Sequence, residues 1–252
     1  MRPQTLVFAT NPAYGHGLCR RLVRIDVADG VISAHLSDTF HEMRCRIWHD
    51  GQSVLAIEGT SIRVPTTACP GAVAVLQELV GTPLTASGQH FYGGGRARHH
   101  CTHLYDLAVL AIRHATGPAG TTCYDAQVPD ETDRPVEISV MRDGVKVHRW
   151  TVREGVILDP PALAGRTLDK GFAAWAADAF ASHELDAATI LARTWLIAIG
   201  RRFLIDEAAG ERIAINTEMI GRCFAYQPER VATAHFIPGQ LRGADALSTR
   251  ID

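Results

Sequence analysis

The fold is decided by residues 22–64, which read LVRIDVADGVISAHLSDTFHEMRCRIWHDGQSVLAIEGTSIRV. Apolar and polar residues alternate through most of this stretch, a period of two that is typical of strands with one buried face. Asp29-Gly30 and Asp50-Gly51 interrupt the alternation. Because an Asp-Gly pair between alternating runs is a strong hairpin signal, the stretch predicts an antiparallel meander. The expected strands are 24–27, 31–38, 41–48, 54–57 and 61–64.

Two helices are predicted after the meander. The first runs from Cys69 to Gly81, with Pro70 in its first turn and the glycine at its end. The second runs from Thr102 to Ala115 and is apolar on nearly every side, as expected of a central, buried helix. Both are expected to cover the meander.

The second half of the chain repeats this order of elements. Arg142-Asp143-Gly144 joins two alternating runs, and two further helices follow. We therefore predict an α+β fold: an antiparallel meander packed by helices, with a second β-hairpin plus helices in the C-terminal half. The whole chain, 1–252, is expected to be one domain, with an N-terminal half at about 18–117, a C-terminal half at about 121–205, and an irregular tail at 206–252.

The composition excludes several classes of protein. A net charge of −2 gives no electrostatic footprint for nucleic acid. No run approaches the roughly 18–20 apolar residues that cross a bilayer, and the N-terminus has no signal-peptide core. We expect a cytoplasmic protein with no membrane partner. Its six cysteines are widely spread and include no CxxC pair. We therefore expect all six to be free thiols in a reducing compartment.

Strand parity places two titratable side chains toward the core. The apolar side of strand 31–38 ends in Asp38, and the apolar side of strand 41–48 begins with His41. Burying such groups is costly unless they are paired or bound to a ligand. We predict that Asp38 orients His41 as a general base. The alternative is a turn aspartate that caps a backbone amide beside a core histidine.

Two cysteines stand at predicted helix starts. Cys69 precedes one helix and Cys101 the other. Free N–H groups and the positive dipole end at a helix start lower a thiol pKa and attract anions. Both are candidates for substrate binding, and a nucleophile, a metal ligand or a small buried residue remain alternatives.

The segment around the second helix start, HHCTHLYD at 99–106, holds further candidates. His103 and Asp106 are three residues apart on a helix, so the carboxylate is predicted to hold the imidazole as an acid or substrate-positioning group. Tyr105 and Tyr124 are candidates to bind a phenolic oxygen. The alternative is a polar helix start at the surface.

A glycine-rich loop precedes this helix. Arg96 and Arg98 follow three consecutive glycines and are candidates for a mobile anion-binding lid. The loop has no Walker or GxGxxG context, which disfavours nucleotide binding, and neither GxSxG nor HExxH occurs in the chain.

Four motifs carry a resemblance to a known family. They are DxxHxM at 38–43, PxxxCPxA at 65–72 with LVG at 79–81, CTHL at 101–104, and YxAxVPD at 124–130. Over roughly residues 18–205 the chain resembles a bacterial family described only as a domain of unknown function. The resemblance implies small-molecule catabolism, because such families occur in soil bacteria that degrade aromatic and alicyclic compounds. It implies no catalytic assignment.

The leading hypothesis is an enzyme without a cofactor, a lyase or hydrolase that acts on an aromatic-type small molecule by acid–base chemistry. The first alternative is a metal-binding protein in which Cys69, Cys101, His103 and His41 converge on zinc or iron; a fainter similarity to iron–sulfur scaffold proteins points the same way. A third reading is a non-catalytic partner subunit. A homodimer is the candidate assembly.

Overall fold

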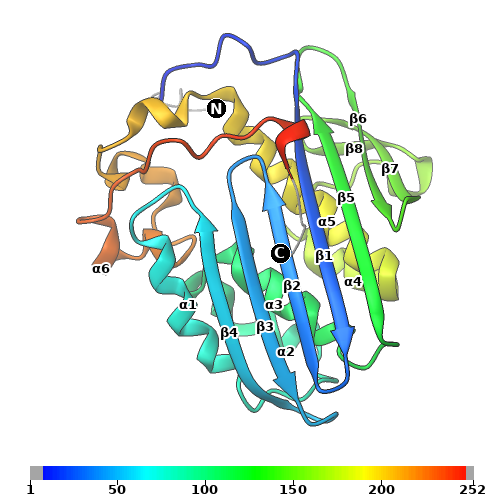
Figure 1. Cartoon of the computed structure of the whole chain (residues 1–252). Coiled ribbons are helices and arrows are strands. Elements are labelled where there is room, and N and C mark those ends of the chain that lie inside the picture. Colours follow the sequence, from blue (N-terminus) through cyan, green and yellow to red (C-terminus); the bar gives the residue numbers. More distant parts are fainter. Residues whose placement is uncertain (1–7, 248–252) are drawn as a thin grey trace.

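The computed structural model describes residues 8–247, which fold around one eight-stranded sheet (Figure 1). The strand order is β4-β3-β2-β1-β5-β6-β7-β8, and every neighbouring pair is antiparallel. The predicted α+β class, with its N-terminal meander and second hairpin, is confirmed. The strands are β1 (Leu18–Ala28), β2 (Val31–Asp38), β3 (Glu42–His49), β4 (Val54–Arg63), β5 (Gly120–Pro129), β6 (Val136–Arg142), β7 (Val145–Arg153) and β8 (Val156–Asp159).

Helices cover one face of the sheet and lie behind the strands in Figure 1. The helix α3 packs on β2 and β3, and α5 packs on β1, β5 and β6. The α-helices are α1 (Ala72–Val75), α2 (Gly88–Tyr92), α3 (Thr102–His114), α4 (Phe172–Ala179), α5 (Ser182–Ala198) and α6 (Pro228–Val231). The 3-10 helices are η1 (Cys69–Gly71), η2 (Leu76–Leu79), η3 (Gly93–His99), η4 (Pro161–Leu163), η5 (Ile199–Arg202), η6 (Ile205–Ala208), η7 (Ile213–Ile215), η8 (Thr217–Met219), η9 (Phe224–Tyr226) and η10 (Ala244–Ala246).

The Asp-Gly pairs make the predicted turns. Gly30 links β1 to β2 with φ at +67°. Between β6 and β7, Asp143 and Gly144 have φ values of +50° and +80°. Positive φ at both central residues matches the right-handed twist of the flanking strands, which explains the aspartate-glycine pair at this position.

Two predicted elements differ in the structure. The helix expected from Cys69 to Gly81 is a chain of short turns, η1, α1 and η2, since Pro70 and Gly71 stand at its start and valines follow. The two short strands expected at 54–57 and 61–64 are one strand, β4. A Cβ on Gly59 would lie 2.9 Å from a side-chain atom of Leu76. The glycine therefore lets Leu76 of η2 pack closely on β4, and the strand continues through it.

The strand β5 was missed by the sequence patterns, and it joins the two halves. It pairs with β1 in a register that sets Cys19 opposite Val128. Its first residues are Gly120, Thr121 and Thr122, which hide the alternation that begins only at Tyr124. The two halves of the chain therefore form one continuous sheet.

The tail crosses one end of the sheet. After Leu204 the described residues contain only 3-10 turns and the short helix α6, as the sequence predicts; the last five residues of the tail lie outside the described range. Arg242 donates its backbone N–H to the carbonyl of Thr39 at 2.9 Å. Arg63 of β4 donates to the carbonyls of Gln240 and Asp38, each at 2.6 Å. The turn between β2 and β3 is thus clamped between β4 and the tail.

Within residues 8–247, no helix is long and apolar enough to cross a membrane.

Candidate functional site

The turn between β2 and β3 is built around one carboxylate. Oδ1 of Asp38 accepts hydrogen bonds from the backbone N–H groups of Phe40 and His41, both at 2.8 Å, and from Nδ1 of His41 at 3.0 Å. Asp38 is fully buried and His41 is buried. The carboxylate therefore caps the turn and also holds the imidazole. The role of His41 as a general base stays a prediction.

A third residue completes this group from the neighbouring strand. Arg21 of β1 lies directly opposite Asp38 of β2 in the strand register. Its Nη2 and Nε lie 2.6 Å and 3.1 Å from Oδ2 of Asp38, and both groups are buried. Sequence reasoning missed Arg21, although its parity with Val23 and Ile25 places it on the core side of β1.

The surroundings of Asp38 fix its ionisation. Burial alone would raise the pKa of this carboxyl, but His41 and the charge on Arg21 hold that pKa well below its usual range. An ionised carboxylate can only accept hydrogen bonds, so Nδ1 of His41 carries the proton of this bond. Nε2 of neutral His41 is then the unprotonated nitrogen, with no hydrogen-bond partner among the residues that the structure describes.

A second imidazole lies against the first. The ring centroids of His41 and His103 are 4.0 Å apart, at an interplanar angle of 45°. His103 stands in the first turn of α3 and is partly exposed. Its Nδ1 lies 3.4 Å from Nη2 of Arg21. A guanidinium has donors only, so Nδ1 of His103 accepts and its Nε2 bears the proton.

His103 is held in the neutral form. Burial, together with the nearby His41 and the charge on Arg21, keeps the pKa of His103 well below its usual range, although Asp38 acts in the opposite direction. The two contacting imidazoles consequently hold opposite tautomers when both are neutral. His41 presents a lone pair at Nε2, and His103 presents an N–H there.

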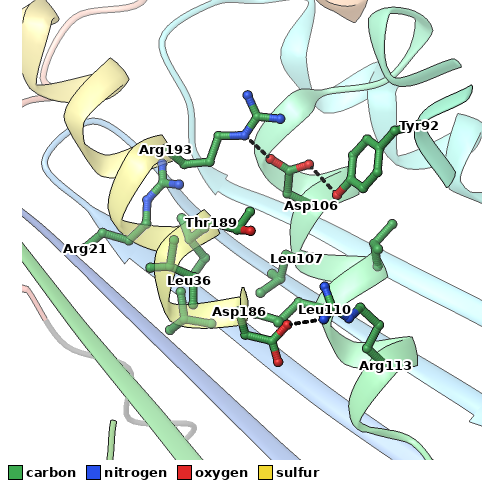
Figure 2. Close-up of a pocket in the computed structure, with 13 residues that line it drawn as sticks. Arg21, Leu36, Tyr92, Asp106, Leu107, Leu110, Arg113, Asp186, Thr189 and Arg193 are labelled. Carbon is green, nitrogen blue, oxygen red and sulfur yellow. Dashed lines mark hydrogen bonds and ion pairs between the residues drawn. The ribbon is translucent and has the colours of Figure 1, made fainter. Parts of the chain in front are cut away.

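Asp106 has other partners than the predicted one. Its Oδ1 accepts a hydrogen bond from the hydroxyl of Tyr92 at 2.9 Å, and its Oδ2 forms an ion pair with Nε of Arg193 at 2.8 Å (Figure 2). The expected pairing of Asp106 with His103 is therefore wrong. The carboxylate of Asp106 is instead bound by Arg193 of α5 and Tyr92 of α2. His103 contacts Arg21 and His41.

The two predicted tyrosines are packing residues in this structure. Tyr105 is fully buried, donates its hydroxyl to the carbonyl of Phe91 at 2.8 Å, and stacks on His100 with centroids 4.2 Å apart. Tyr124 is buried on β5 with its ring edge-on to His114. Burial raises the pKa of both phenols, so both are protonated near neutral pH.

The cysteines at helix starts are buried thiols. Sγ of Cys69 lies 3.0 Å from the hydroxyl of Thr66, and Sγ of Cys101 lies 4.0 Å from the sulfur of Met43. Burial raises the pKa of Cys69 to about 11 and raises that of Cys101 as well. The expected lowering of these pKa values is wrong, because Cys69 begins a three-residue turn and desolvation outweighs the backbone N–H groups at Cys101.

The predicted anion-binding arginines lie on η3. Arg96 is partly exposed and lies against Tyr105, whose pKa it acts to lower. Arg98 is exposed, and its backbone carbonyl accepts a hydrogen bond from Gln227 of the tail. The loop is thereby tied to the tail at this point.

The four candidate metal ligands fall into two sets. The rings of His41 and His103 contact each other, whereas Cys69 contacts Thr66 and Cys101 contacts Met43. In residues 8–247 no three histidine, cysteine, aspartate or glutamate side chains form a group that could hold a metal ion.

A small cavity lies on the other side of Arg21 from the histidine pair, and neither histidine lines it. It lies between α3 and α5 and has a volume of about 40 Å³, room for roughly three water molecules. Arg21, Arg113 and Arg193 line it together with Asp106 and Asp186 (Figure 2). Arg21 joins the two sites, because the same guanidinium that lines the cavity also contacts Asp38 and His103.

The fold and site define an α+β protein with a buried Asp38–His41 pair against the partly exposed His103, and an arginine-lined cavity nearby. Residues 23–116 match the model of the family described as Protein of unknown function (DUF2889). The resemblance to a family of unknown function is thus confirmed for that part of the chain, which holds β2, β3 and the histidine pair. Neither a search of curated proteins nor a search of solved structures gave a match.

Proposed function

We propose that this protein is an enzyme that moves protons on a small molecule, as a lyase or hydrolase of aromatic-type compounds. The observation that carries the proposal is the contact between the rings of His41 and His103, whose centroids are 4.0 Å apart. Asp38 fixes the tautomer of one ring at 3.0 Å, and Arg21 fixes that of the other at 3.4 Å. A base and a hydrogen-bond donor thereby stand side by side, which is the arrangement that proton transfer needs.

The two histidines have different roles in the proposed reaction. Nε2 of His41 takes a proton from a carbon acid, or from water in a hydrolysis. The imidazolium that forms is stabilised by ionised Asp38, as in other carboxylate–histidine pairs. In an elimination the electron pair of the broken C–H bond becomes the new double bond, and the leaving group departs with the electron pair of its own bond to carbon. The N–H at Nε2 of neutral His103 donates a hydrogen bond to the departing anion and keeps its proton.

Proton exchange provides a test that needs no knowledge of the natural substrate. The protein is incubated in D₂O with aryl ketones, cyclic ketones and aryl-substituted keto acids, and loss of the α C–H signal is followed by NMR. We expect exchange on at least one compound class, and loss of that exchange in His41→Gln. His183→Gln is the matched control, because His183 is exposed at the start of α5. Equal exchange in wild type and His41→Gln would contradict the proposal.

A further inference from the structure

We propose that Arg63 is a positioning residue of the candidate site, which fixes the turn between β2 and β3 so that Asp38 holds His41 through Nδ1. The inference rests on the proposed function, since it assigns a further residue to the same site. The side chain of Arg63 acts on the turn through main-chain carbonyl groups.

Four carbonyl oxygens bind the guanidinium of Arg63. Its Nη2 donates to the carbonyls of Asp38 at 2.6 Å and His41 at 3.0 Å. Its Nη1 donates to the carbonyls of Thr39 at 3.2 Å and Gln240 at 2.6 Å. The first three carbonyls all belong to the turn between β2 and β3, and the fourth belongs to the tail. One side chain therefore fixes the carbonyl groups of the whole turn.

The carboxylate of Asp38 holds the same turn through its N–H groups. Oδ1 accepts hydrogen bonds from the backbone N–H groups of Phe40 and His41. The carbonyl of Thr39 and the N–H of Phe40 belong to one planar peptide group. Arg63 binds the carbonyl of this peptide group at 3.2 Å, and Asp38 binds its N–H at 2.8 Å. Rotation of the peptide group would break both bonds, so Arg63 keeps this N–H directed at the carboxylate.

This arrangement reaches the imidazole through a shared oxygen. The Oδ1 of Asp38 that accepts the two backbone N–H groups also binds Nδ1 of His41 at 3.0 Å. The position of Oδ1 depends on those N–H groups, and their direction depends on Arg63. Loss of Arg63 should therefore weaken the bond that keeps the proton of His41 on Nδ1.

The surroundings of Arg63 explain why this position needs an arginine. Arg63 is buried, and the acidic residues whose charges act on it, Asp38 and Glu42, contact Arg21 and His35 instead. Burying a cation is costly, and apolar side chains often fill such places at lower free energy. A lysine has three donors and no planar fork. The bonds to the carbonyls of the turn are thus the feature that only a guanidinium supplies.

Nitrogen-15 NMR of His41 tests the inference with Arg63→Met, Arg63→Lys and Arg242→Met. Arg242 is exposed, and its side chain donates to the carbonyls of Gly239 and Leu241, so it is the matched control for loss of a cation near the turn. At pH 8 we expect wild type and Arg242→Met to carry the proton of His41 on Nδ1. In Arg63→Met the two ring nitrogens should share it. Arg63→Lys should give an intermediate spectrum, because an ammonium donates to at most three carbonyls.

Two further measurements use the same variants. Hydrogen exchange of the Phe40 amide should become at least about tenfold faster in Arg63→Met, because its bond to the carboxylate is weakened. Proton exchange in D₂O is measured with the ketone or keto acid on which wild type is active. The rate at saturation should fall about tenfold to hundredfold in Arg63→Met with an unchanged half-saturating concentration, since a misplaced catalytic group slows the reaction without removing a binding contact. Arg242→Met should match wild type in both.

The inference is overturned if folded Arg63→Met has the His41 tautomer and the Phe40 amide exchange of wild type. It is also overturned if Arg63→Met keeps the full rate of proton exchange, or if Arg242→Met changes the His41 spectrum equally. Where Arg63→Met does not fold, Arg63→Lys replaces it, and a spectrum identical to wild type then overturns the inference. If wild type exchanges no compound, the proposed function fails, while the His41 spectra still decide whether Arg63 positions the turn.

Discussion

Arg21 and Asp38 face each other across β1 and β2, and their side chains meet at 2.6 Å with both groups out of contact with solvent. Each of the two residues also contacts one ring of the histidine pair. Asp38 orients His41, Arg21 orients His103, and the charge of each compensates the other.

Breaking this ion pair on one side should be strongly destabilising. Arg21→Met leaves a buried carboxylate without its counter-ion, and we expect a loss of about 3–5 kcal/mol of unfolding free energy in urea titrations. Arg24→Met on the same strand is the control, since the Arg24–Asp26 pair is partly exposed and should change stability by about 1 kcal/mol or less. The double variant Arg21→Met/Asp38→Asn should recover part of the loss. A cost for Arg21→Met as small as that of the control would mean that the buried pair is not structural.

His41→Ala should abolish activity and leave the fold largely intact. The imidazole faces inward at a strand end, so its removal opens a wall of the site without emptying the core. Loss of a general base lowers the rate about 10²- to 10⁴-fold. Turnover and melting temperature are measured on the same preparation. A lower melting temperature with normal turnover per folded molecule would identify His41 as a core residue.

The free energy of unfolding should decrease as the pH falls below about 6.5, the ordinary pKa of a histidine. The pKa of His103 is lowered in the folded state, so below the unfolded value of about 6.5 the unfolded chain binds a proton that the folded chain does not. Stability therefore decreases as pH falls from that value toward the folded pKa of His103. Urea midpoints between pH 8 and pH 5 should drop less steeply in His103→Gln than in wild type.

His100 and His148 also have lowered pKa values because they are buried, so part of the slope should remain in that variant. Asp38 adds a second loss only below its unfolded pKa of about 3.9, because its folded pKa is lowered too. Identical midpoints for His103→Gln and wild type over the whole range would contradict a neutral His103.

Native cysteines should react slowly with iodoacetamide at pH 8. Burial raises the pKa of Cys69 to about 11 and that of Cys19 and Cys45 to about 12, and it raises the pKa of Cys101 too. Thiolate, the reactive form, is therefore scarce at these positions. Mass spectrometry after labelling should find Cys123 and Cys223 modified first, since these two are partly exposed, and all six sites modified in urea. Rapid native labelling of Cys69 or Cys101 would favour a nucleophile or metal ligand there.

The sequence predicts much of this fold because buried and exposed side chains alternate along its strands. The alternation around Asp38 and His41 predicts that both side chains point inward, and the Asp-Gly pairs predict the turns. The strand β5 is not predicted because the alternation of apolar and polar residues begins only in its middle. The strand β4 is predicted as two short strands because Gly59 resembles a turn residue.

In the candidate site, the sequence predicts only the contact between residues that are close together in the chain. Asp38 and His41 are three residues apart, and their bond follows from the turn. Arg21 lies on another strand, and its pairing with Asp38 depends on the register between β1 and β2. The alternation within one strand does not predict that register. Arg193 is farther away in sequence, on α5, so the competition between His103 and Arg193 for Asp106 could not be foreseen.

Nitrogen-15 NMR of the histidine side chains shows directly which ring nitrogen carries the proton. At pH 8 we expect opposite tautomers in the two contacting rings, with the proton of His41 on Nδ1 and that of His103 on Nε2. Assignment follows from the spectra of His41→Gln and His103→Gln. The same tautomer in both rings, or a protonated imidazolium at His103, would contradict the account.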